Sequence, residues 1–462
     1  MPNIVVKFGG SNLKDKSDVT RIIKVIENYG ERLIVVVSAF YGVTNYLEES
    51  LETLKQGEDV SRTVYSYLHA LKRDAVEYHI TDTALCEEAW NEIDTCLEEL
   101  SNLLKGIYLT ADASPALCDF VLSYGERLSA IFLSYVLKQR ELKSVVAYPE
   151  DFGLITDGIF ANASVDFKKS KHALMEYFKE SKIYVVPGFY GISTKGKVTL
   201  LGRGGSDYSA AAIAKCVDAK SLDVWKDVEG FLTSDPREVS QAKNIKHLSY
   251  VEAAELAYFG AKILHPRCVE PLIEPNISLR LFHIHGASDD SNPLTIIGGD
   301  GYVCASVVKS ITHTSEFGIL KLKGPGVGSK PGILSVVTTA FSNAGININS
   351  VLTSQISINF LLHKNDLHRA KSLIDISTIP SVMEIEHHED VATIAAIGEG
   401  LIDNYGIAAR IFSSLAEEKI NVRMSCSCAS PVVSYFIVSE TDRTRAIQAM
   451  HRSLFEKKFS PK

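Results

Sequence analysis

Short apolar runs and longer amphipathic segments alternate along the first 300 or so residues, and this alternation predicts the secondary structure. Ile4 to Phe8 and Leu33 to Val37 are apolar runs of strand length, and the residues between them have helical spacing. The helix is predicted to start at Ser17, a residue type that caps helices, and to stop at Gly30. A strand, a helix and a second strand in this order indicate an α/β fold with a parallel sheet.

The same reasoning extends to residue 297. Residues 46 to about 110 are charged, poor in Gly and Pro, and carry apolar positions at helical spacing, which predicts a helical insertion that shapes a wall of the site or a subunit contact. Another helix is predicted to begin at Ser114 and Pro115 and to run through SYGERLSAIFLSYVL. Further strands are predicted at Ser144 to Ala147, Leu154 to Thr156, Ile183 to Pro187, Val198 to Leu201 and Leu222 to Trp225.

The pattern changes in the last third of the chain. Two segments, about 311–385 and 391–458, share the order strand, glycine turn, helix, strand, strand, helix. A period of about 80 residues with a βαββαβ order predicts two ferredoxin-like domains after a first domain at 1–297. Neither segment shows a convergent set of titratable residues, so we expect ligand sensing or dimerisation there rather than catalysis.

Composition narrows the class of protein. The 462 residues are 46% hydrophobic and 23% charged, which is ordinary for a globular protein. The sequence has no run of about 20 apolar residues and no signal-peptide layout at MPNIVVKFGG, so we expect a cytoplasmic protein without a membrane span. A net charge of −8 and a pI near 5.9 give no basic surface for nucleic acid.

The cysteines are scattered and mostly lie in apolar or helical runs, so we expect free buried thiols. The closest two are separated by one residue and have no second pair to complete a ligand set, so we infer no metal site. The eight cysteines are Cys86, Cys96, Cys118, Cys216, Cys268, Cys304, Cys426 and Cys428.

The stretch LGRGGSDYSAA, Leu201 to Ala211, is predicted to form a strand end, a glycine turn and a helix start. Such a turn presents backbone N–H groups to an anion; its glycines, Gly202, Gly204 and Gly205, carry no Cβ atoms to obstruct a ligand, and Ser206 is placed to cap the helix. Arg203 and Asp207 offer opposite charges, which suits the carboxylate and ammonium of an α-amino acid. The alternative is a surface turn with a structural Arg–Asp pair.

Three further residues carry candidate chemistry. Lys7 ends the first strand and is followed by Gly9 and Gly10; the spacing is not that of a Walker P-loop, but a lysine before a glycine pair can hold a phosphate. Lys262, in GAKILHP, is a second candidate phosphate ligand. Solvated lysines are the alternative at both positions. Glu126 lies inside an apolar helix and needs a cation, either Arg127, a core arginine or a substrate ammonium.

Six motifs occur in the order KFGGSN, VVSAFYGVTN, SYGERLSA, LGRGGSDYSAA, VWKDVEGFLTSDPR and GAKILHP. Together they resemble the aspartate kinases of the amino acid kinase family, and the two C-terminal repeats resemble the paired ACT domains of those enzymes. The resemblance covers essentially the whole chain and is weakest over 46–110. Because no GxGxxG fingerprint follows the repeats, the chain resembles the monofunctional enzyme rather than the fusion with homoserine dehydrogenase.

The resemblance implies a parallel-rich open sheet with helices on both faces and MgATP-dependent phosphorylation of the β-carboxylate of L-aspartate. The product, 4-phospho-L-aspartate, begins the pathway to lysine, threonine, methionine and isoleucine. A carboxylate is already ionised near neutral pH, so this chemistry needs no general base. Two alternatives stay open: a kinase for another carboxylate, such as glutamate, and a non-catalytic amino acid sensor. The resemblance also implies a dimer, or a dimer of dimers, built through the ACT domains.

The resemblance assigns roles to individual residues. Lys7 stabilises the transferring phosphoryl group, Arg203 clamps the α-carboxylate, and Glu126 and Asp207 hold the ammonium. Ser38, Thr44 and Ser206 complete the substrate site. The nucleotide site consists of Lys7, Gly9, Gly10, Ser11, Trp225, Lys226, Asp227, Arg237 and Lys262. The effector site of the first ACT domain consists of Asn347, Asn349, Thr353 and Ser354.

The chain departs from the family pattern at a few positions. Ser11 and Asn12 stand where Thr and Ser are usual, and Lys226 stands where threonine is frequent. Lysine-sensitive relatives often carry acids at the positions of Asn349 and Gln355. A lysine effector carries a second ammonium on its side chain, and two neutral amides bind that group less well than two carboxylates do. Both lysine and threonine therefore stay open as the effector.

Overall fold

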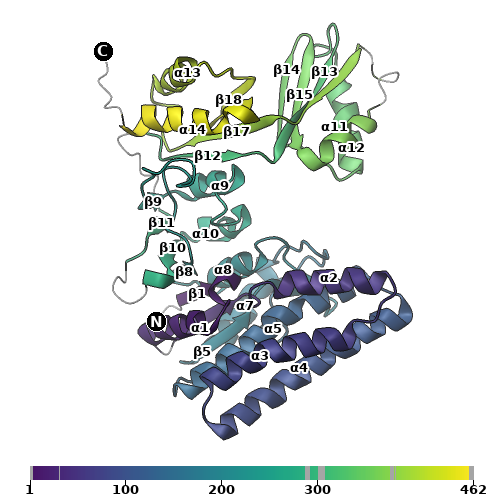
Figure 1. The fold of residues 1–462 in the computed structure, drawn as a ribbon, viewed down its shortest axis with the longest axis vertical. Coiled ribbons are helices and arrows are strands. Elements are labelled where there is room, and N and C mark those ends of the chain that lie inside the picture. The colour runs from purple at the N-terminus through teal and green to yellow at the C-terminus, as the bar shows by residue number, and fades with distance from the viewer. Residues whose placement is uncertain are drawn as a thin grey trace. The chain divides into compact units, whose positions relative to one another are not determined.

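The computed structural model describes residues 4–30, 32–286, 292–299, 307–374, 379 and 381–456. The chain divides into two compact units (Figure 1). Unit 1 comprises Met1–Phe231, Asn244–Ala257 and Lys262–Gly301, and unit 2 comprises Leu232–Lys243, Tyr258–Ala261 and Tyr302–Lys462. Each unit has its own hydrophobic core.

Unit 1 is built on an eight-stranded sheet with β1 (Ile4–Phe8) near its centre. β1 pairs in parallel with β2 (Leu33–Val37) on one side and with β8 (Ser221–Lys226) on the other. The outer strands are β5 (Ile183–Pro187) and β3 (Ser144–Val146) beyond β2, and β10 (Ser278–His283), β11 (Thr295–Ile297) and β9 (His247–Leu248) beyond β8. After β1 the chain first builds strands on one side of it, β2, β3 and β5, and only later adds β8 and β10 on the other side. The carboxyl end of β1 is therefore at a topological switch point, where α/β sheets bind ligands.

Among the residues that the structure describes, β10–β11 is the one antiparallel pair of this sheet. The predicted parallel-rich α/β fold is therefore confirmed. A small second sheet of unit 1 consists of β4 (Ile155–Thr156), β6 (Tyr190–Ser193) and β7 (Val198–Leu200).

Helix α1 (Lys16–Tyr29) joins β1 to β2 and ends at Gly30, as predicted. Its start differs from the prediction, because Asp15 rather than Ser17 is the N-cap. The Asp15 carboxylate accepts hydrogen bonds from the backbone N–H groups of Ser17 and Asp18. A carboxylate at this position also interacts favourably with the positive end of the helix dipole.

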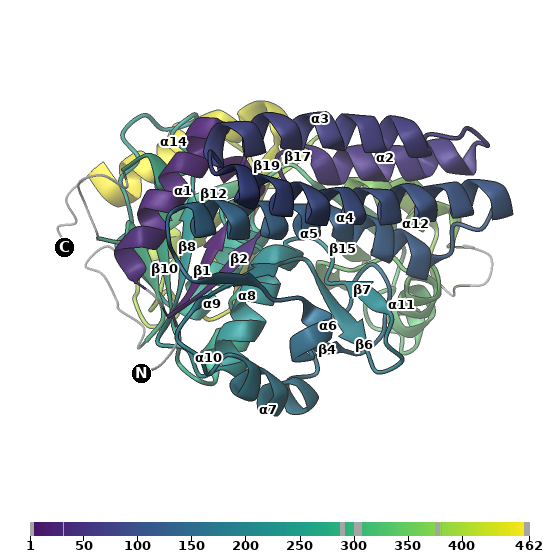
Figure 2. The ribbon, with the colours of Figure 1, turned by 90° about the horizontal axis from the view of Figure 1, so that it is seen from below.

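The predicted helical insertion is confirmed as three helices, α2 (Val43–Lys55), α3 (Ser61–His79) and α4 (Thr83–Thr110). They pack with α5 (Pro115–Gln139), and Figure 2 shows α3, α4 and α5 running alongside one another. Helix α5 is long and apolar enough to cross a membrane, but 89% of its most apolar window is buried inside the protein. We therefore describe it as the core helix of unit 1.

The remaining helices of unit 1 include α8, which follows the glycine turn and packs against β1. Their bounds are α6 (Pro149–Phe152), α7 (Phe167–Tyr177), α8 (Gly205–Cys216) and α10 (Glu270–Ile273), and α9 (Tyr250–Tyr258) ends at the boundary with unit 2.

Unit 2 contains two four-stranded antiparallel sheets. The first has the order β14-β15-β13-β16, in which the first and third strands of the repeat are central, as in a ferredoxin-like fold. Its elements are β13 (Phe317–Lys323), α11 (Ile333–Asn343), β14 (Ser350–Ser354), β15 (Ser357–His363), α12 (Lys364–Ser372) and β16 (Glu384–His388).

The second sheet takes one strand from outside its own repeat. Its own elements are β17 (Val391–Ile397), α13 (Ile407–Glu417), β18 (Met424–Ser430), β19 (Val433–Ser439) and α14 (Arg443–His451). The edge position beside β17 is filled by β12 (Ser310–Thr314), which precedes the first repeat. The predicted first repeat, which begins near residue 311, therefore includes a strand that belongs to the second sheet. The strands before and after the first repeat as observed, β12 and β17, pair with each other in that second sheet. The predicted domain limits stay predictions.

The described cysteines are free thiols, as expected, but only Cys96, Cys216 and Cys268 are buried. The prediction of burial is wrong for Cys86, Cys118 and Cys426, which are partly exposed. Cys304 and the side chain of Cys428 lie outside the described part of the chain.

Candidate active site

Two lysines bind one aspartate at the carboxyl edge of the central strands. Lys7 lies on β1, Lys226 ends β8, and Asp207 lies in the first turn of α8. The Nζ atom of Lys7 is 2.5 Å from Oδ1 of Asp207, and the Nζ atom of Lys226 is 3.0 Å from Oδ2. Lys7 is only 5% exposed, so the solvated strand-end lysine considered as an alternative is not what the fold contains.

The charges of this cluster are strongly coupled. Burial alone would raise the pKa of Asp207, but the ammonium groups of Lys226 and Lys7 outweigh burial and hold that pKa well below its usual range. Burial lowers the pKa of Lys7, with Asp207 opposing this effect and Lys226 adding to it. Burial also raises the pKa of the neighbouring thiol of Cys268 to about 12, so this cysteine is a neutral neighbour of the cluster.

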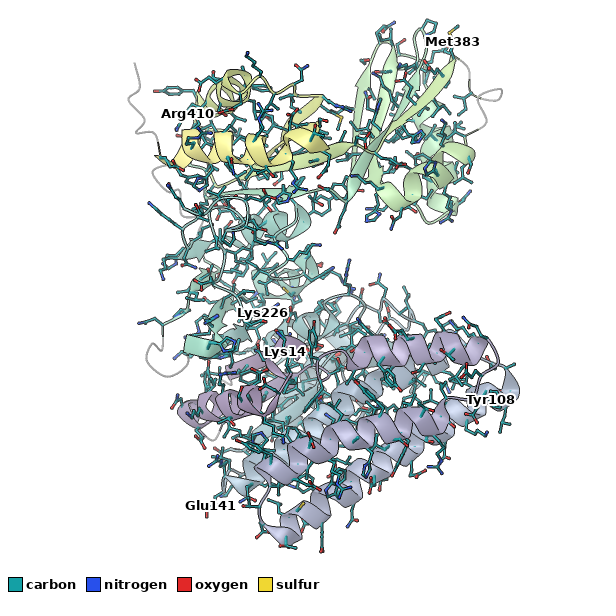
Figure 3. All side chains as sticks on the ribbon, in the orientation of Figure 1. Lys14, Tyr108, Glu141, Lys226, Met383 and Arg410 are labelled. Carbon is teal, nitrogen blue, oxygen red and sulfur yellow. The ribbon has the colours of Figure 1, made fainter. Side chains whose placement is uncertain are left out.

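The glycine pair after β1 leaves room for the lysine and leads to a second cluster. A Cβ atom on Gly9 would lie 3.2 Å from the Nζ atom of Lys7, so glycine at this position gives that ammonium space. The Ser11 hydroxyl donates to Asp227 at 2.8 Å, and Lys14 forms an ion pair with the same carboxylate at 3.1 Å. Figure 3 labels Lys14 and Lys226 at this edge of unit 1.

Asn12 completes the link between the first and fifth motifs, because its amide donates to the backbone carbonyl of Trp225 at 2.7 Å. The Ser11-Asn12 pair, which departs from the family pattern, thus joins the loop after β1 to the end of β8. The structure brings together Lys7, Gly9, Gly10, Ser11, Trp225, Lys226 and Asp227 of the predicted nucleotide site.

The glycine turn is shaped by packing as well as by any ligand. The N-cap of α8 is Gly204 in the left-handed region at φ 70, and Ser206 lies inside the helix, so the prediction that Ser206 caps it is wrong. A Cβ atom on Gly204 would lie 2.4 Å from the Cβ atom of His265. Glycine is therefore required there by the contact with His265 and by the left-handed backbone. The sequence pattern alone predicts only that this glycine leaves space for a ligand.

Arg267 holds this turn from the segment after GAKILHP. Its guanidinium donates to the backbone carbonyls of Leu201 and Ala163, at 2.9 and 2.8 Å, and lies over the ring of Tyr208. Sequence reasoning missed Arg267 and His265, because nothing in their local pattern says that they support a loop some 60 residues earlier.

Arg203 is exposed on the turn. No ion pair joins it to Asp207 in the part of the chain that the structure describes, because both oxygens of Asp207 face lysines. The alternative of a structural pair between Arg203 and Asp207 is therefore not supported.

Glu126 is buried in α5, as predicted, and its carboxyl group is only partly hydrogen-bonded. It accepts a hydrogen bond from the backbone N–H of Ala39, while Oε2 is buried without a hydrogen-bond partner. Burial raises the pKa of Glu126 to about 8, and Lys7 and Lys72 oppose that rise. Arg127, one of the predicted partners, instead forms an ion pair with Glu150.

Lys72 is the cation near Glu126 that sequence reasoning missed. It lies on α3, is 1% exposed, and its Nζ atom is 3.3 Å from the centre of the Phe40 ring. Burial lowers the pKa of Lys72 well below its usual value, with Glu126 among the groups that oppose this. A lysine within an amphipathic helical pattern normally lies on the solvated face, so no local signal distinguishes it.

Ser38 and Thr44 flank the loop that Glu126 supports. Both are partly buried, and the backbone N–H of Ser38 donates to the carbonyl of Phe8 at 3.2 Å, which places Ser38 beside the end of β1. Close packing holds this loop on α5, because a Cβ atom on Gly125 would lie 2.8 Å from that of Ala39. These contacts bring Ser38 to the same sheet edge as Lys7.

Two predicted nucleotide ligands remain. Lys262 is exposed in unit 1, next to Ile263, whose backbone carbonyl accepts a hydrogen bond from Lys226. Arg237 belongs to unit 2, where its guanidinium pairs with Asp235 at 2.6 Å. The neighbouring Glu238 accepts from Arg443 and Thr444 of α14, so this loop is anchored to the second repeat.

The predicted effector residues lie at and before β14 in unit 2. Asn347, Thr353 and Ser354 are exposed, whereas Asn349 is partly buried and its amide donates to the hydroxyl of Tyr258 at 2.6 Å. Tyr258 is the last residue of α9, so a segment outside the repeats contacts the predicted effector site within unit 2.

Magnesium is implied by the family chemistry, and the carboxylates at the sheet edge that could meet it are Asp207 and Asp227. Each is engaged by at least one ammonium group. Mg²⁺ commonly keeps several waters and relies on substrate phosphates with one or two carboxylates. Asp207 and Asp227 therefore fit a magnesium ion that arrives bound to the nucleotide. They fit less well a site in which the protein alone supplies the ligands.

The family comparisons agree with this geometry. Residues 3–283 match the amino acid kinase family, and residues 320–375 and 394–454 match an ACT domain family. The chain belongs to the amino acid kinase family. The predicted resemblance to aspartokinases is confirmed along almost the whole chain, and so is the predicted fold.

Two relatives and one solved structure illustrate this similarity. The chain is 31% identical to the bifunctional aspartokinase/homoserine dehydrogenase of Haemophilus influenzae, over 98% of this chain but 57% of that protein, so it spans a little over half of such relatives. It is 29% identical to lysine-sensitive aspartokinase 3 of Escherichia coli, over 98% and 99% of the two chains. The crystal structure of E. coli aspartokinase III with aspartate and ADP (R-state) matches with a TM-score of 0.80 at 27% identity, covering 98% and 99%.

Proposed function

We propose that this protein is an aspartate kinase, which transfers the γ-phosphoryl group of MgATP to the β-carboxylate of L-aspartate. A β-carboxylate oxygen attacks the γ-phosphorus, the bond to the β–γ bridging oxygen breaks, and ADP leaves with the electron pair. The observation that carries the proposal is the buried Lys7–Asp207–Lys226 cluster at the switch point of the sheet. The aspartate and ADP bound by the E. coli structure support the choice of substrate and of ATP.

The cluster suits a reaction between two anions. The attacking carboxylate and the polyphosphate repel each other, so the protein must align them and neutralise charge. Lys7 and Lys226 supply two ammonium groups in a buried environment, where such charges act more strongly than in water. The Gly9 and Gly10 amides lie beside Lys7, and magnesium carried by the nucleotide adds positive charge.

The proposed contacts to aspartate come mainly from side chains that are not already paired within the lysine–aspartate cluster. Asp207 already faces two lysines, whereas the buried Oε2 atom of Glu126 has no hydrogen-bond partner and offers the better acceptor for the aspartate ammonium. Arg203 clamps the α-carboxylate with its planar fork. Ser38, Thr44 and Ser206 complete the substrate contacts in this proposal.

A hydroxamate assay tests the acceptor directly, because hydroxylamine traps an acyl phosphate. We expect MgATP-dependent hydroxamate with aspartate and only background with glutamate or without an acceptor. Comparable product from glutamate would favour another carboxylate kinase, and no turnover with either acid would favour the non-catalytic sensor. The Lys7→Ala variant serves as the negative control.

Regulation is the second part of the proposal. An amino acid of the aspartate pathway, lysine or threonine, binds at Asn347, Asn349, Thr353 and Ser354 and favours a less active arrangement. The lysine sensitivity in the name of the E. coli relative supports an amino acid effector. We also propose a homodimer, or a dimer of dimers, built through the ACT domains, which analytical ultracentrifugation of the full chain tests.

A further inference from the structure

Two histidines and a glutamate converge in the first repeat of unit 2, where sequence reasoning expected no such set. His368 lies on α12, His387 lies on β16, and Glu389 follows that strand directly. The Oε1 atom of Glu389 is 3.0 Å from the Nε2 atom of His368 and 3.9 Å from that of His387. All three potential ligand atoms lie within 4.8 Å of one another.

The fold holds these side chains on two packed elements. β16 is fixed in register on β13, with His387 opposite Leu320. Helix α12 lies against this sheet through the fully buried Leu367 and Ala370 (Figure 1). The cluster is therefore a product of tertiary structure within one repeat, and its three members do not depend on the arrangement of the two units.

One carboxylate oxygen of Glu389, at the centre of the cluster, lacks a hydrogen-bond donor in the part of the chain that the structure describes. The Oε1 atom of Glu389 is shielded from solvent and has no hydrogen bond of acceptable geometry among the described residues. Removing a carboxylate oxygen from water without such a bond is unfavourable. A neutral imidazole that turns its Nε2 lone pair toward this oxygen adds repulsion, whereas a bound cation would convert the converging lone pairs into bonds.

We infer that His368, His387 and Glu389 form a binding site for a divalent transition metal, with Zn²⁺ as the ion that best fits the donor set. Two imidazoles and one carboxylate leave a fourth position open, which is a common zinc arrangement. Zinc–ligand bonds of about 2.0–2.2 Å place tetrahedral ligand atoms about 3.3 Å apart. The three ligand atoms lie within 4.8 Å of one another, and the His368 side chain, which is 75% exposed, has solvent beside it into which it can turn.

A metal at this position would join α12 to the end of β16. Binding to the folded state alone stabilises that state by RT ln(1 + c/Kd), where c is the free metal concentration, so the ion would hold α12 and β16 together in the first repeat. The open fourth position is filled by water or by an external ligand.

The experiment uses the full chain after chelator treatment and dialysis. Zn²⁺ affinity is measured by competition with a chromophoric chelator, and Co²⁺ is added separately as a spectroscopic probe of four-coordinate geometry. We expect one Zn²⁺ per chain at the high-affinity site and visible ligand-field bands with Co²⁺. Affinity should fall about tenfold or more in His368→Ala, His387→Ala and Glu389→Gln.

His388→Ala is the matched control. His388 is the next residue on β16, points to the opposite face of the strand, and lies near Glu386. Its variant should keep the wild-type affinity and Co²⁺ spectrum. Absence of Zn²⁺ binding, equal loss in His388→Ala and His387→Ala, or unchanged binding in the His368→Ala/His387→Ala double variant would each overturn the inference. Circular dichroism without metal checks that every variant is folded.

Discussion

The ammonium of Lys7 lies 2.5 Å from the carboxylate of Asp207, and the two side chains are only 6% and 9% exposed. The residues are far apart in the sequence, yet β1 and the first turn of α8 bring them to the same sheet edge. An ion pair held this far from water is a functional-site signature when it lies at a switch point.

Lys7→Ala is expected to lower kcat by about a hundredfold or more, because it removes positive charge that acts mainly in the transition state. Steady-state kinetics with saturating MgATP and aspartate measure this loss, and circular dichroism checks the fold. Lys24→Ala, at an exposed position on α1 away from this cluster, is the control and should retain most activity. If Lys7→Ala kept more than about a third of wild-type kcat, Lys7 would not have the role proposed here.

Arg203→Lys is expected to raise the KM for aspartate strongly while changing the KM for MgATP little. A lysine ammonium cannot reproduce the two parallel donors that a guanidinium offers to a carboxylate. Initial rates over a matrix of both substrates separate the two constants. An unchanged aspartate KM would move Arg203 to the nucleotide side or to a structural role.

Glu126 is expected to make aspartate binding depend on pH. Its pKa of about 8 keeps the free protein protonated at neutral pH, so binding of the substrate ammonium releases a proton, and affinity rises as pH increases through 8. Calorimetry in buffers of different ionisation enthalpy measures this proton. Glu126→Gln should abolish the proton release; a release that persists in this variant would assign it to another group.

The same group predicts how stability changes with pH. Because the folded pKa of Glu126 is above that of the unfolded chain, its contribution is complete below about pH 4.5 and is lost as pH rises through about 8. Glu126→Gln should therefore gain stability relative to wild type across this window. Urea unfolding at several pH values measures the difference, and a constant difference would contradict the assignment.

Lys72→Met is expected to stabilise the protein by about 1–3 kcal/mol, because it removes a buried donor without a hydrogen-bond partner. The gain should be largest at low pH, where the folded protein must carry the buried charge, and should shrink as pH rises toward the ordinary lysine pKa of 10.5, because the unfolded chain then loses the proton that favoured it. Lys24→Met, at an exposed helix position, is the control. A destabilised Lys72→Met protein would mean that the ammonium has a partner it needs.

Asn349→Asp is expected to strengthen inhibition by lysine, because a carboxylate binds a second ammonium better than an amide does. Titration of lysine and of threonine against the activity of both proteins tests this. Asn343→Asp, at an exposed position at the end of α11 and outside the proposed effector site, controls for a general change in charge. Potent lysine inhibition of the unmodified chain, with no gain in Asn349→Asp, would contradict the charge argument.

Local pattern was sufficient for much of this protein. Strands such as β5 (Ile183–Pro187) and the start of α5 at Pro115 follow from apolar runs and capping residues, because burial and hydrogen bonding within a few residues determine them. The order of six motifs was sufficient for the family. The position of Lys7 at a strand end also followed from the sequence, because it depends only on where one strand stops.

Tertiary structure alone decided which remote groups meet. Lys226 pairs with Asp207 across 19 residues, Lys72 approaches Glu126 from another helix, and β12 joins the sheet of the second repeat. The clustering of His368 with His387 arises in the same way, from a helix packed on a strand. Hydrophobic periodicity shows which face of a helix or strand is buried. It does not show which other helix or strand that face packs against, because this depends on the packing of the whole chain.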